Sequence, residues 1–514
     1  MILMTRCRFR WVFCQLEALR HCFPPSVRRI LGELPESLDE TYERILKDIR
    51  RSNQAHAQRL LQCLVVAVRP LRVQELAEVL AFDFTPRGIP ELNRGWRWED
   101  REEAVMSACS SLVIVVKDGD SQIVQFSHFS VKEFLTSSRL AESSRDVSRY
   151  HILLEGAHTI LAQACLGVLL RLDDRIDRNT IKSFPLARYA AEHWVTHARF
   201  ENVASHIKDG MECLFDMEKP HFATWLWIYN PGGGRSMSTM RPERPKVLPI
   251  YHAALLGFRD LTEHLLAEHP EDVHAKGGYE VTPLHASARR GHSDIFLLLV
   301  EHFENVDIHG IWHQTALHRA SEGGHVEIGQ WLLDRGADIN AQDIDDWTPL
   351  YLATTYGHLE FARMLLSRGA ATNTPCEVGK TPLHVASQYG NVELVRSLLE
   401  HGADPNACTE AGLTAFEVAS RQGRREIVQL LSEYKTKSVK ESCHLADFYD
   451  SVTGDVAQFT NDDISIELER VVGDGHALAS NACHHSCFGT FLLLILPLCL
   501  VLAVAAISRL FSCI

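Results

Sequence analysis

A four-residue motif returns every 33 residues through the second half of the chain, and it restricts the fold more than any other feature. The motif reads TPLH at residues 282–285, and the later copies keep the threonine with small changes behind it. A glycine stands nine residues after each threonine, and a leucine seventeen residues after it. Repetition at a fixed period of this length predicts a solenoid, because a single unit is too small to bury its own apolar face. The recurring threonines are Thr282, Thr315, Thr348, Thr381 and Thr414.

Each unit predicts two short helices. Threonine caps a helix N-terminus and proline suits the first helical turn, while the glycine ends that helix because it accepts a positive φ. A second helix follows, as in residues 392–399, where apolar side chains recur at helical spacing. A degenerate first unit aligns at residues 248–254, with Gly257 in the place of the repeat glycine. We therefore expect six units over residues 248–434, in which Leu332 and Leu398 face the core between units.

The repeated residues resemble the ankyrin repeat in period, motif and glycine position. The resemblance implies a stack of helix pairs that binds protein partners through its hairpin tips and the exposed side of each first helix. It implies a binding function without catalysis, so we expect no catalytic residue, no cofactor and no metal site in the repeats. The last unit carries Arg421, Gln422, Arg424 and Arg425, which fits the polar exterior of a capping repeat.

Projecting the repeat onto the sequence gives the candidate partner-binding residues. Tryptophan, tyrosine and arginine dominate the energy of protein interfaces, and all three types recur at these positions. The two tip tryptophans could instead pack against neighbouring repeats. The tip positions hold Trp312, Gln314, Asp345, Trp347, Val378 and Lys380, and the positions before the repeat glycines hold Arg289, Arg290, Glu322, Tyr356, Gln388, Tyr389, Arg421 and Gln422.

The negative charge of the chain is concentrated in the repeats. Residues 248–434 contain 13 basic and 26 acidic side chains, whereas residues 1–229 contain 30 of each. An acidic field repels nucleic-acid phosphates and favours a partner with a basic surface. We therefore expect a protein partner and no nucleic acid, although an ordinary solvated acidic surface accounts for the same count.

The first 229 residues show no repeat and predict a separate mostly helical region. Ser37 and Glu40 form a capping box at the start of a helix, and apolar helices follow at residues 60–66 and 73–80. Two alternating stretches flank the turn at residues 118–120, which predicts a β-hairpin. Another helix begins near His128. Helices followed by a hairpin indicate a winged-helix arrangement.

Three segments carry a second resemblance. LPESLDETYERIL, RPLRVQELAEVLA and FSHFSVKEFL are similar to the region after the nucleotide-binding core in fungal NACHT proteins of the STAND class. Residues 8–16 resemble the last helices of that core. The resemblance implies a remnant of the core at residues 1–34, a winged-helix-like domain at 35–140 and a helical region at 141–229. In such proteins a winged-helix histidine, here His128, can contact the nucleotide phosphate. Without the nucleotide core His128 has no phosphate to contact, so we expect it to pack in the core or at the hairpin end unless a separate NACHT chain docks.

The chain departs from that class where the chemistry would lie. A NACHT ATPase needs the phosphate loop G-x-x-x-x-G-K-[ST], and residues 379–381 form only its last three positions, inside a repeat. We expect a turn there and no nucleotide hydrolysis. Two hypotheses follow: a partner-binding scaffold or sensor that is not an enzyme, or an incomplete record of an ATP-dependent switch.

The C-terminal segment predicts a membrane anchor. Residues 488–507 contain no charged side chain, and 20 residues of helix span roughly 30 Å, about one bilayer core. With few residues after it, the segment describes a tail anchor with the bulk of the chain in the cytosol. A removed lipid-anchor signal, with small residues at 480–482, is the alternative. We expect a flexible linker at 230–247 and a disordered acidic spacer at 435–487.

Other residue types suggest little further chemistry. Most clustered histidines belong to the repeats, and the cluster at residues 483–487 is too short to supply a four-ligand zinc site. Cys487 and Cys513 are candidates for acylation. A palmitoyl transferase or a channel is disfavoured, because the chain has one apolar segment and no Asp-His-His-Cys motif. The expected fold class is therefore mostly α: a winged-helix-like α/β domain with a helical region, an ankyrin α-solenoid and a C-terminal transmembrane helix.

Overall fold

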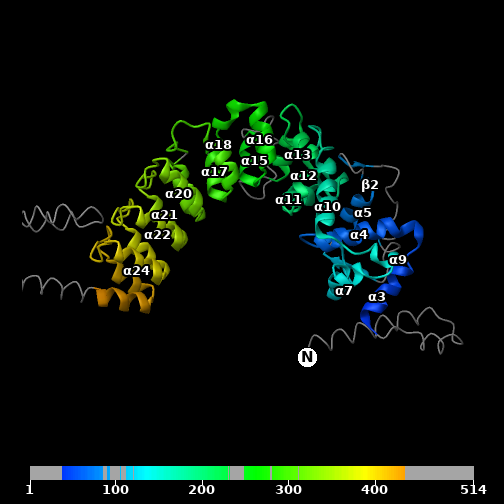
Figure 1. Cartoon of the computed structure of the whole chain (residues 1–514), viewed down its shortest axis with the longest axis horizontal. Coiled ribbons are helices and arrows are strands. Elements are labelled where there is room, and N and C mark those ends of the chain that lie inside the picture. The colour runs from blue at the N-terminus through cyan, green and yellow to red at the C-terminus, as the bar shows by residue number, and fades with distance from the viewer. Residues whose placement is uncertain are drawn as a thin grey trace, which may run out of the picture. The chain divides into compact units, whose positions relative to one another are not determined.

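The protein is mostly helical, with two small sheets near the N-terminal end of the described chain (Figure 1). The computed structural model describes residues 37–84, 89–92, 105, 112–119, 121–229, 231, 248–277, 281–310 and 312–434. Four of the expected segments lie outside the described residues: the core remnant at 1–34, the spacer at 435–487, the membrane helix at 488–507 and, except for Pro231, the linker at 230–247. Among the helices that are described, none is long and apolar enough to cross a bilayer.

The first region is a winged-helix domain. Its hairpin strands β4 and β5 pair antiparallel around Gly119, which has a φ of +57°, as the sequence predicted. Helices α4, α5 and α7 pack against β5. The elements are α3 (Leu38–Lys47), the 3₁₀ turn η2 (Arg51–Asn53), α4 (Gln54–Val66), β1 (Leu71–Arg72), α5 (Val73–Leu80), β2 (Phe82–Asp83), β3 (Glu91–Leu92), β4 (Val113–Asp118), β5 (Ser121–Phe126), α7 (Phe129–Leu135), α8 (Ser138–Ala141) and α9 (Arg145–Ser148).

Local side-chain contacts explain where these helices begin. The Ser37 hydroxyl accepts a hydrogen bond from the Glu40 amide at 3.2 Å and caps α3. His128 caps α7 through its ring, which accepts from the Ser130 amide at 3.3 Å. The short strands β1, β2 and β3 were not predicted, because two residues cannot display an alternating pattern. Strand β1 completes a sheet of order β1-β5-β4.

Helix α5 carries two buried carboxylates, and one of them joins the winged-helix domain to the helices that follow it. Glu75 is 1% exposed and binds both terminal nitrogens of Arg69, at 2.7 and 2.8 Å. Glu78 is 5% exposed and accepts a hydrogen bond from the Leu186 amide at 2.7 Å, just before α11. A buried charge is tolerated only where it is paired and hydrogen-bonded. The Glu78 contact therefore ties α5 to the start of α11.

The helical region is built around large aromatic side chains. Trp194 is fully buried and lies edge-on to Trp225, with ring centroids 5.6 Å apart. Its other side stacks on Phe258, which belongs to the first repeat, at 5.4 Å. The elements are α10 (Leu154–Leu169), the 3₁₀ turn η4 (Thr180–Ser183), α11 (Ala187–Ala198), α12 (Val203–His206), α13 (Lys208–Phe215) and α14 (His221–Ile228).

The repeats form helix pairs, each with an inner helix that begins at the motif and an outer helix behind it. Neighbouring inner helices pack on one another along the stack. The inner helices are α15 (Pro249–Leu256), α17 (Pro283–Arg290), α19 (Ala316–Gly323), α21 (Pro349–Tyr356), α23 (Pro382–Tyr389) and α25 (Ala415–Arg421); the outer helices are α16 (Arg259–Glu268), followed by η5 (Pro270–His274), then α18 (Ser293–Val300), α20 (Val326–Asp334), α22 (Leu359–Ser367) and α24 (Val392–Glu400). Residues 425–434 are also helical.

The motif residues act as the sequence predicted. Thr315 and Thr348 accept hydrogen bonds from the amides three residues on, and Leu332 and Leu398 are fully buried. Gly291 has a φ of +74°, and a Cβ there would lie 2.3 Å from the His325 ring of the next repeat. Only glycine therefore allows the repeats to approach this closely.

Candidate partner-binding site

One residue of the repeated motif differs in α21, and a groove lies beside it. In α17, α19 and α23 the fourth motif residue is a histidine whose Nε2 bonds a backbone carbonyl of the next hairpin tip. His318 reaches the Trp347 carbonyl at 3.0 Å, and His384 reaches the Leu413 carbonyl at 3.0 Å. Tyr351 stands in this place in α21, and the partner of its hydroxyl is the Cys376 thiol at 3.5 Å. The tip before α23 is therefore not held by a histidine.

The groove has a volume of about 410 Å³ and runs between α21 and α23. The Trp347 and Tyr351 rings form one wall, with centroids 5.2 Å apart. Tyr351, Cys376 and Val385 make a buried cluster, and Trp347 packs against it. Burial raises the pKa of the Tyr351 hydroxyl above its ordinary value. The nearby Cys376 thiol raises the same pKa further, by a smaller amount. Other lining residues are Asp345, Thr355, Glu377, Val378, Lys380, Gln388 and Tyr389.

A buried aspartate shapes the tip that carries Trp347. Asp343 is 5% exposed, and its carboxylate accepts hydrogen bonds from the amides of Asp345 and Trp347 at 3.0 and 2.9 Å. Gln314 of the preceding tip donates to the same carboxylate at 2.8 Å. Gln314 is itself buried, so its prediction as an exposed contact residue is wrong. It links two tips instead.

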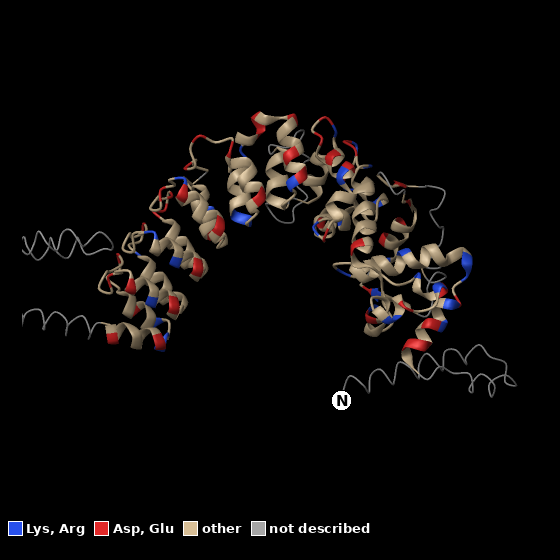
Figure 2. Ribbon diagram, in the orientation of Figure 1, with Lys and Arg blue, Asp and Glu red and all other residues tan. Residues whose placement is uncertain are grey.

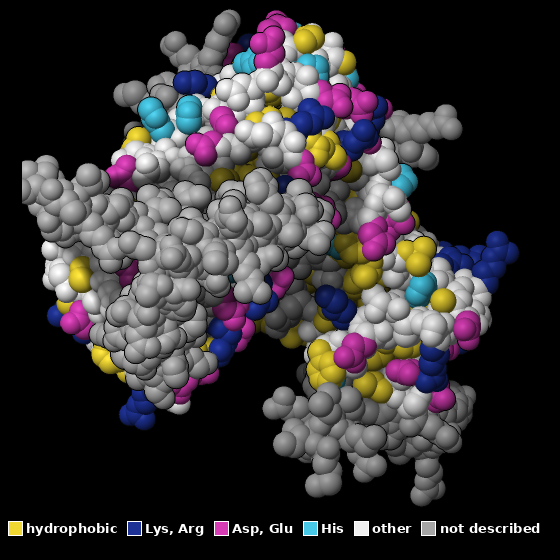
Figure 3. Space-filling model, turned by 60° about the vertical axis from the view of Figure 1, so that its left-hand side comes forward, with side chains coloured by type: hydrophobic (Ala, Val, Ile, Leu, Met, Phe, Trp, Pro, Cys, Tyr) yellow, Lys and Arg dark blue, Asp and Glu magenta, His cyan; other side chains and the backbone are white. Residues whose placement is uncertain are grey.

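The groove keeps apolar surface open between charged groups. Tyr389 is 56% exposed and Val378 is 50% exposed. The charged side chains of the lining are Asp345, Glu377 and Lys380. Lys380 Nζ donates to Gln388 Oε1 at 3.0 Å. Figure 2 shows Asp and Glu along the loops and helix ends of the repeats, with Lys and Arg placed more sparsely. On the face visible in Figure 3, acidic and apolar side chains lie next to one another.

The structure brings six of the predicted contact residues together in this groove. They are Asp345, Trp347, Val378, Lys380, Gln388 and Tyr389. Residues 376–380 form a tight turn, in which Gly379 has a φ of +72° and donates to the Cys376 carbonyl at 2.8 Å. The sequence predicted a turn at residues 379–381. The groove thus has a wall from each of two neighbouring repeats.

Other predicted contact residues meet around Glu322 instead. Its carboxylate binds Arg289 at 2.6 Å and Arg319 at 3.0 Å, and Tyr356 donates to it at 3.4 Å. Trp312 is 42% exposed, with the Arg319 guanidinium 5.9 Å from its ring centroid. These side chains form a ladder across α17, α19 and α21 on the surface of the repeats. Arg290 and Arg421 are exposed elsewhere on the stack.

Sequence reasoning missed Tyr351, Cys376 and Val385, which form the floor of the groove. A signal was present at Tyr351, because it replaces the histidine of the TPLH motif and is larger. Cys376 and Val385 carry no such signal, since apolar side chains at those positions are typical of any packed repeat.

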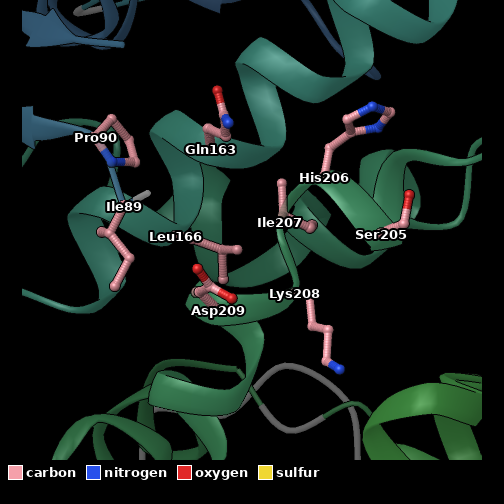
Figure 4. A pocket seen from close by; sticks show the side chains of 10 residues that line it. Ile89, Pro90, Gln163, Leu166, Ser205, His206, Ile207, Lys208 and Asp209 are labelled. Atoms are coloured by element: carbon pink, nitrogen blue, oxygen red, sulfur yellow. The ribbon is translucent and has the colours of Figure 1, made fainter. Parts of the chain in front are cut away.

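A second cavity lies in the helical region, outside the repeats. It has a volume of about 300 Å³ and is lined by residues from α10, α12 and α13 and by Ile89 and Pro90. Ser205 and His206 both bond the Asn202 carbonyl of their own turn, at 2.6 and 3.0 Å. Figure 4 shows the Lys208 side chain extending away from those of Gln163 and His206. The polar groups that line this cavity do not converge. No cluster of three or more metal-ligating side chains occurs within the described ranges.

Comparison with known proteins agrees with both kinds of domain. The family model for ankyrin repeats (3 copies) matches residues 250–343, 312–376, 341–409 and 371–442. The model for the winged helix domain of GPI inositol-deacylase matches residues 42–145. The chain therefore contains ankyrin repeats and a winged-helix domain, as predicted.

A curated protein also resembles part of the chain. It is the azaphilone pigments biosynthesis cluster protein L of Monascus ruber, which is 31% identical over 283 residues. The match covers 51% of this chain, and the chain spans 58% of the length of that protein.

Proposed function

We propose that this protein is a non-enzymatic adaptor that binds a protein partner in the groove between α21 and α23. The observation that supports this most is the grouping of Trp347, Tyr351 and Tyr389 around an open groove. Aromatic side chains in a preformed recess are the usual energetic centre of a protein interface. The ankyrin repeats support the same conclusion, since such repeats generally mediate contacts between proteins.

The partner that fits this surface carries basic residues beside an apolar one. Asp345 and Glu377 line the groove with one lysine, Lys380, and the repeats have a formal net charge of −13 from 13 basic and 26 acidic side chains. Opposite charge speeds encounter and suppresses unsuitable partners. The aromatic walls suit an aliphatic or aromatic side chain. Nucleic acid is a poor ligand for the same electrostatic reason.

We further propose that residues 488–507 anchor the adaptor to a membrane, with the repeats on the cytosolic side. Twenty residues without a charge support this part of the proposal. A relationship to the NACHT class is part of the proposal, and the order of a winged-helix domain followed directly by α10–α14 supports it. An ATP-dependent switch is the alternative function, and binding of ATP or ADP by the purified chain would favour it.

Affinity capture from cells tests the adaptor function. The full chain, carrying an epitope tag, is expressed in a filamentous fungus and isolated after mild crosslinking. The Trp347→Ala, Tyr389→Ala double variant is compared with Leu297→Ala, which removes a 44% exposed leucine from an outer helix. We expect a set of proteins retained by the wild type and Leu297→Ala but lost with the double variant. Identical capture by all three would contradict binding in the groove.

The name of the Monascus ruber protein suggests where to look first. That protein is named for a pigment biosynthesis cluster, so proteins encoded beside the gene for this chain are the first candidates among those captured. Carbonate extraction of cells that express the chain with and without residues 488–514 tests the anchor separately. Release into the soluble fraction is expected only for the truncated chain.

A further inference from the structure

Two kinds of hydrogen bond from side chains to backbone carbonyls join neighbouring repeats. The tip bond is the one from the motif histidine to the next hairpin tip, as in His318 to the Trp347 carbonyl. The end bond comes from the residue just after the repeat glycine and reaches back to the last turn of the preceding inner helix. His325 bonds the Arg289 carbonyl at 3.0 Å, and His358 bonds the Glu322 carbonyl at 2.9 Å.

Three of the four junctions between α17 and α25 contain both bonds. At α17/α19 and α19/α21 histidines supply them all. At α23/α25 the tip bond comes from His384, and the end bond comes from Arg424, whose Nε reaches the Gln388 carbonyl at 3.3 Å. An arginine can therefore replace the histidine of the end bond.

The junction between α21 and α23 contains neither bond. Tyr351 replaces the tip histidine, and Asn391 stands where the end bond would start. The Asn391 side chain turns back and caps its own helix, accepting from the Leu394 amide at 3.2 Å. A Cβ on Gly357 would meet nothing within 4 Å, whereas one on Gly390 would lie 2.9 Å from Arg424 Nε. The place beside Gly357 is thus open, while the matching places beside Gly291, Gly324 and Gly390 are filled.

This junction also leaves a carbonyl without the donor that its counterparts have. The Arg289, Glu322 and Gln388 carbonyls each accept an end bond. Thr355 holds the same position in α21, and no side-chain donor from the described part of the chain reaches its carbonyl. Thr355 also lines the groove, together with Asp345 and Glu377. An unclaimed carbonyl accepts from an N–H donor, and the excess of acidic over basic side chains in residues 248–434 favours a donor that is positively charged.

We propose that the partner inserts an arginine at the α21/α23 junction, where its guanidinium donates to the Thr355 carbonyl as Arg424 donates to Gln388. This rests on the proposed function, since an apolar neighbour of that arginine would occupy the groove beside Trp347. Guanidinium suits the place better than ammonium, because its planar fork stacks on aromatic rings and donates in several directions. The partner thereby supplies the bond that the repeat sequence omits, and it links α21 to α23.

The test uses a phage-displayed library of random 12-residue peptides selected on the full chain. Peptides that bind the wild type but not Trp347→Ala are synthesised with each arginine retained or replaced by citrulline, which is neutral. We expect these peptides to contain arginine next to an aliphatic or aromatic residue. Citrulline should weaken binding at least tenfold, since a hydrogen bond from a charged group contributes about that much.

Variants of Asn391 give the matched comparison. Asn391→Arg supplies an internal guanidinium beside Gly357 and should weaken peptide binding at least tenfold. Asn391→Ala removes the helix cap equally but leaves the place open, so its peptide affinity should stay within about threefold of the wild type. Circular dichroism melts of both variants check that the repeats remain folded.

The outcomes separate the two proposals. Peptides that need Trp347 but bind equally well with citrulline, or bind Asn391→Arg as tightly as the wild type, would overturn the arginine site and leave the adaptor function standing. A selection that yields no peptide dependent on Trp347 would overturn both proposals.

Discussion

The N-terminal region and the repeats are stabilised in different ways. In residues 37–229 the polar contacts that join separate elements follow no repeat, and several connect elements far apart in sequence, as when Glu78 bonds the Leu186 amide. In the repeats the same few bonds return every 33 residues and join only neighbours. A loss in the first region should therefore affect the whole region, whereas a loss in the repeats should loosen the nearest units first. The difference also explains why one junction can depart from the pattern while its neighbours keep it.

The largest effect is expected in the N-terminal region. Trp194→Ala removes a fully buried ring that contacts Trp225, Phe215 and Phe258. We expect a loss of about 4 kcal/mol in the free energy of unfolding, from lost burial and the cavity left behind. Urea unfolding measures it, and hydrogen exchange should show protection lost together across α10–α14. Loss confined to α11 would contradict the contrast between the two regions.

Leu398→Ala tests the repeats in the same way. Leu398 is fully buried in α24, and its truncation should lower the free energy of unfolding by about 3 kcal/mol. Hydrogen exchange should show the loss in α21–α25 with α17 nearly unchanged. Equal loosening of α17 and α24 would mean that the stack behaves as one cooperative block.

Acid should weaken the junctions that depend on histidine. Burial lowers the pKa of His285 from 6.5 to about 4, with a smaller contribution from Arg319, while a hydrogen bond to the Ile308 carbonyl acts in the opposite direction. The unfolded chain then binds more protons than the folded one between these values. The contribution of neutral His285 to the free energy of unfolding is therefore complete above pH 6.5. It is lost as the pH falls toward 4, by up to about 3 kcal/mol. Urea midpoints of the wild type and His285→Gln over this range should diverge, with a flatter profile for the variant.

The smallest effects are expected for the two tip tryptophans, Trp347 and Trp312. Trp347 is partly buried against Tyr351, Cys376 and Val385, so Trp347→Ala should destabilise the repeats by about 1–2 kcal/mol. Trp312 is 42% exposed, and its replacement should change the free energy of unfolding by less than about 0.5 kcal/mol. Thermal melts compare the two variants, and an equal loss in both would contradict their different packing.

The repeated part of the fold could be predicted from sequence because each motif residue acts locally. A threonine caps, a glycine ends a helix and a leucine at the right spacing is buried, whatever lies further away. Gln314 shows where that reasoning stops. Its position marks a hairpin tip, but its burial depends on Asp343 of the next tip, which lies 29 residues on.

The candidate site was predictable only in part for the same reason. Trp347, Lys380 and Tyr389 follow from the repeat register, which marks them as tip or inner-helix residues. The groove itself arises from Tyr351, and the open place beside Gly357 arises from Asn391. Both are departures from the repeated pattern, so they are visible in the sequence once the repeats are aligned position by position.

The stacking of Trp194 on Phe258 has a practical consequence for work on the isolated repeats. The first inner helix, α15, has no repeat before it, and the helical region takes that neighbour's place: Phe222 and Trp225 pack against His252, and α13 packs against α16. A fragment that begins at residue 248 would expose this apolar face to water. The helical region is therefore the N-terminal cap of the solenoid, and a fragment meant to stay monomeric should begin before α10.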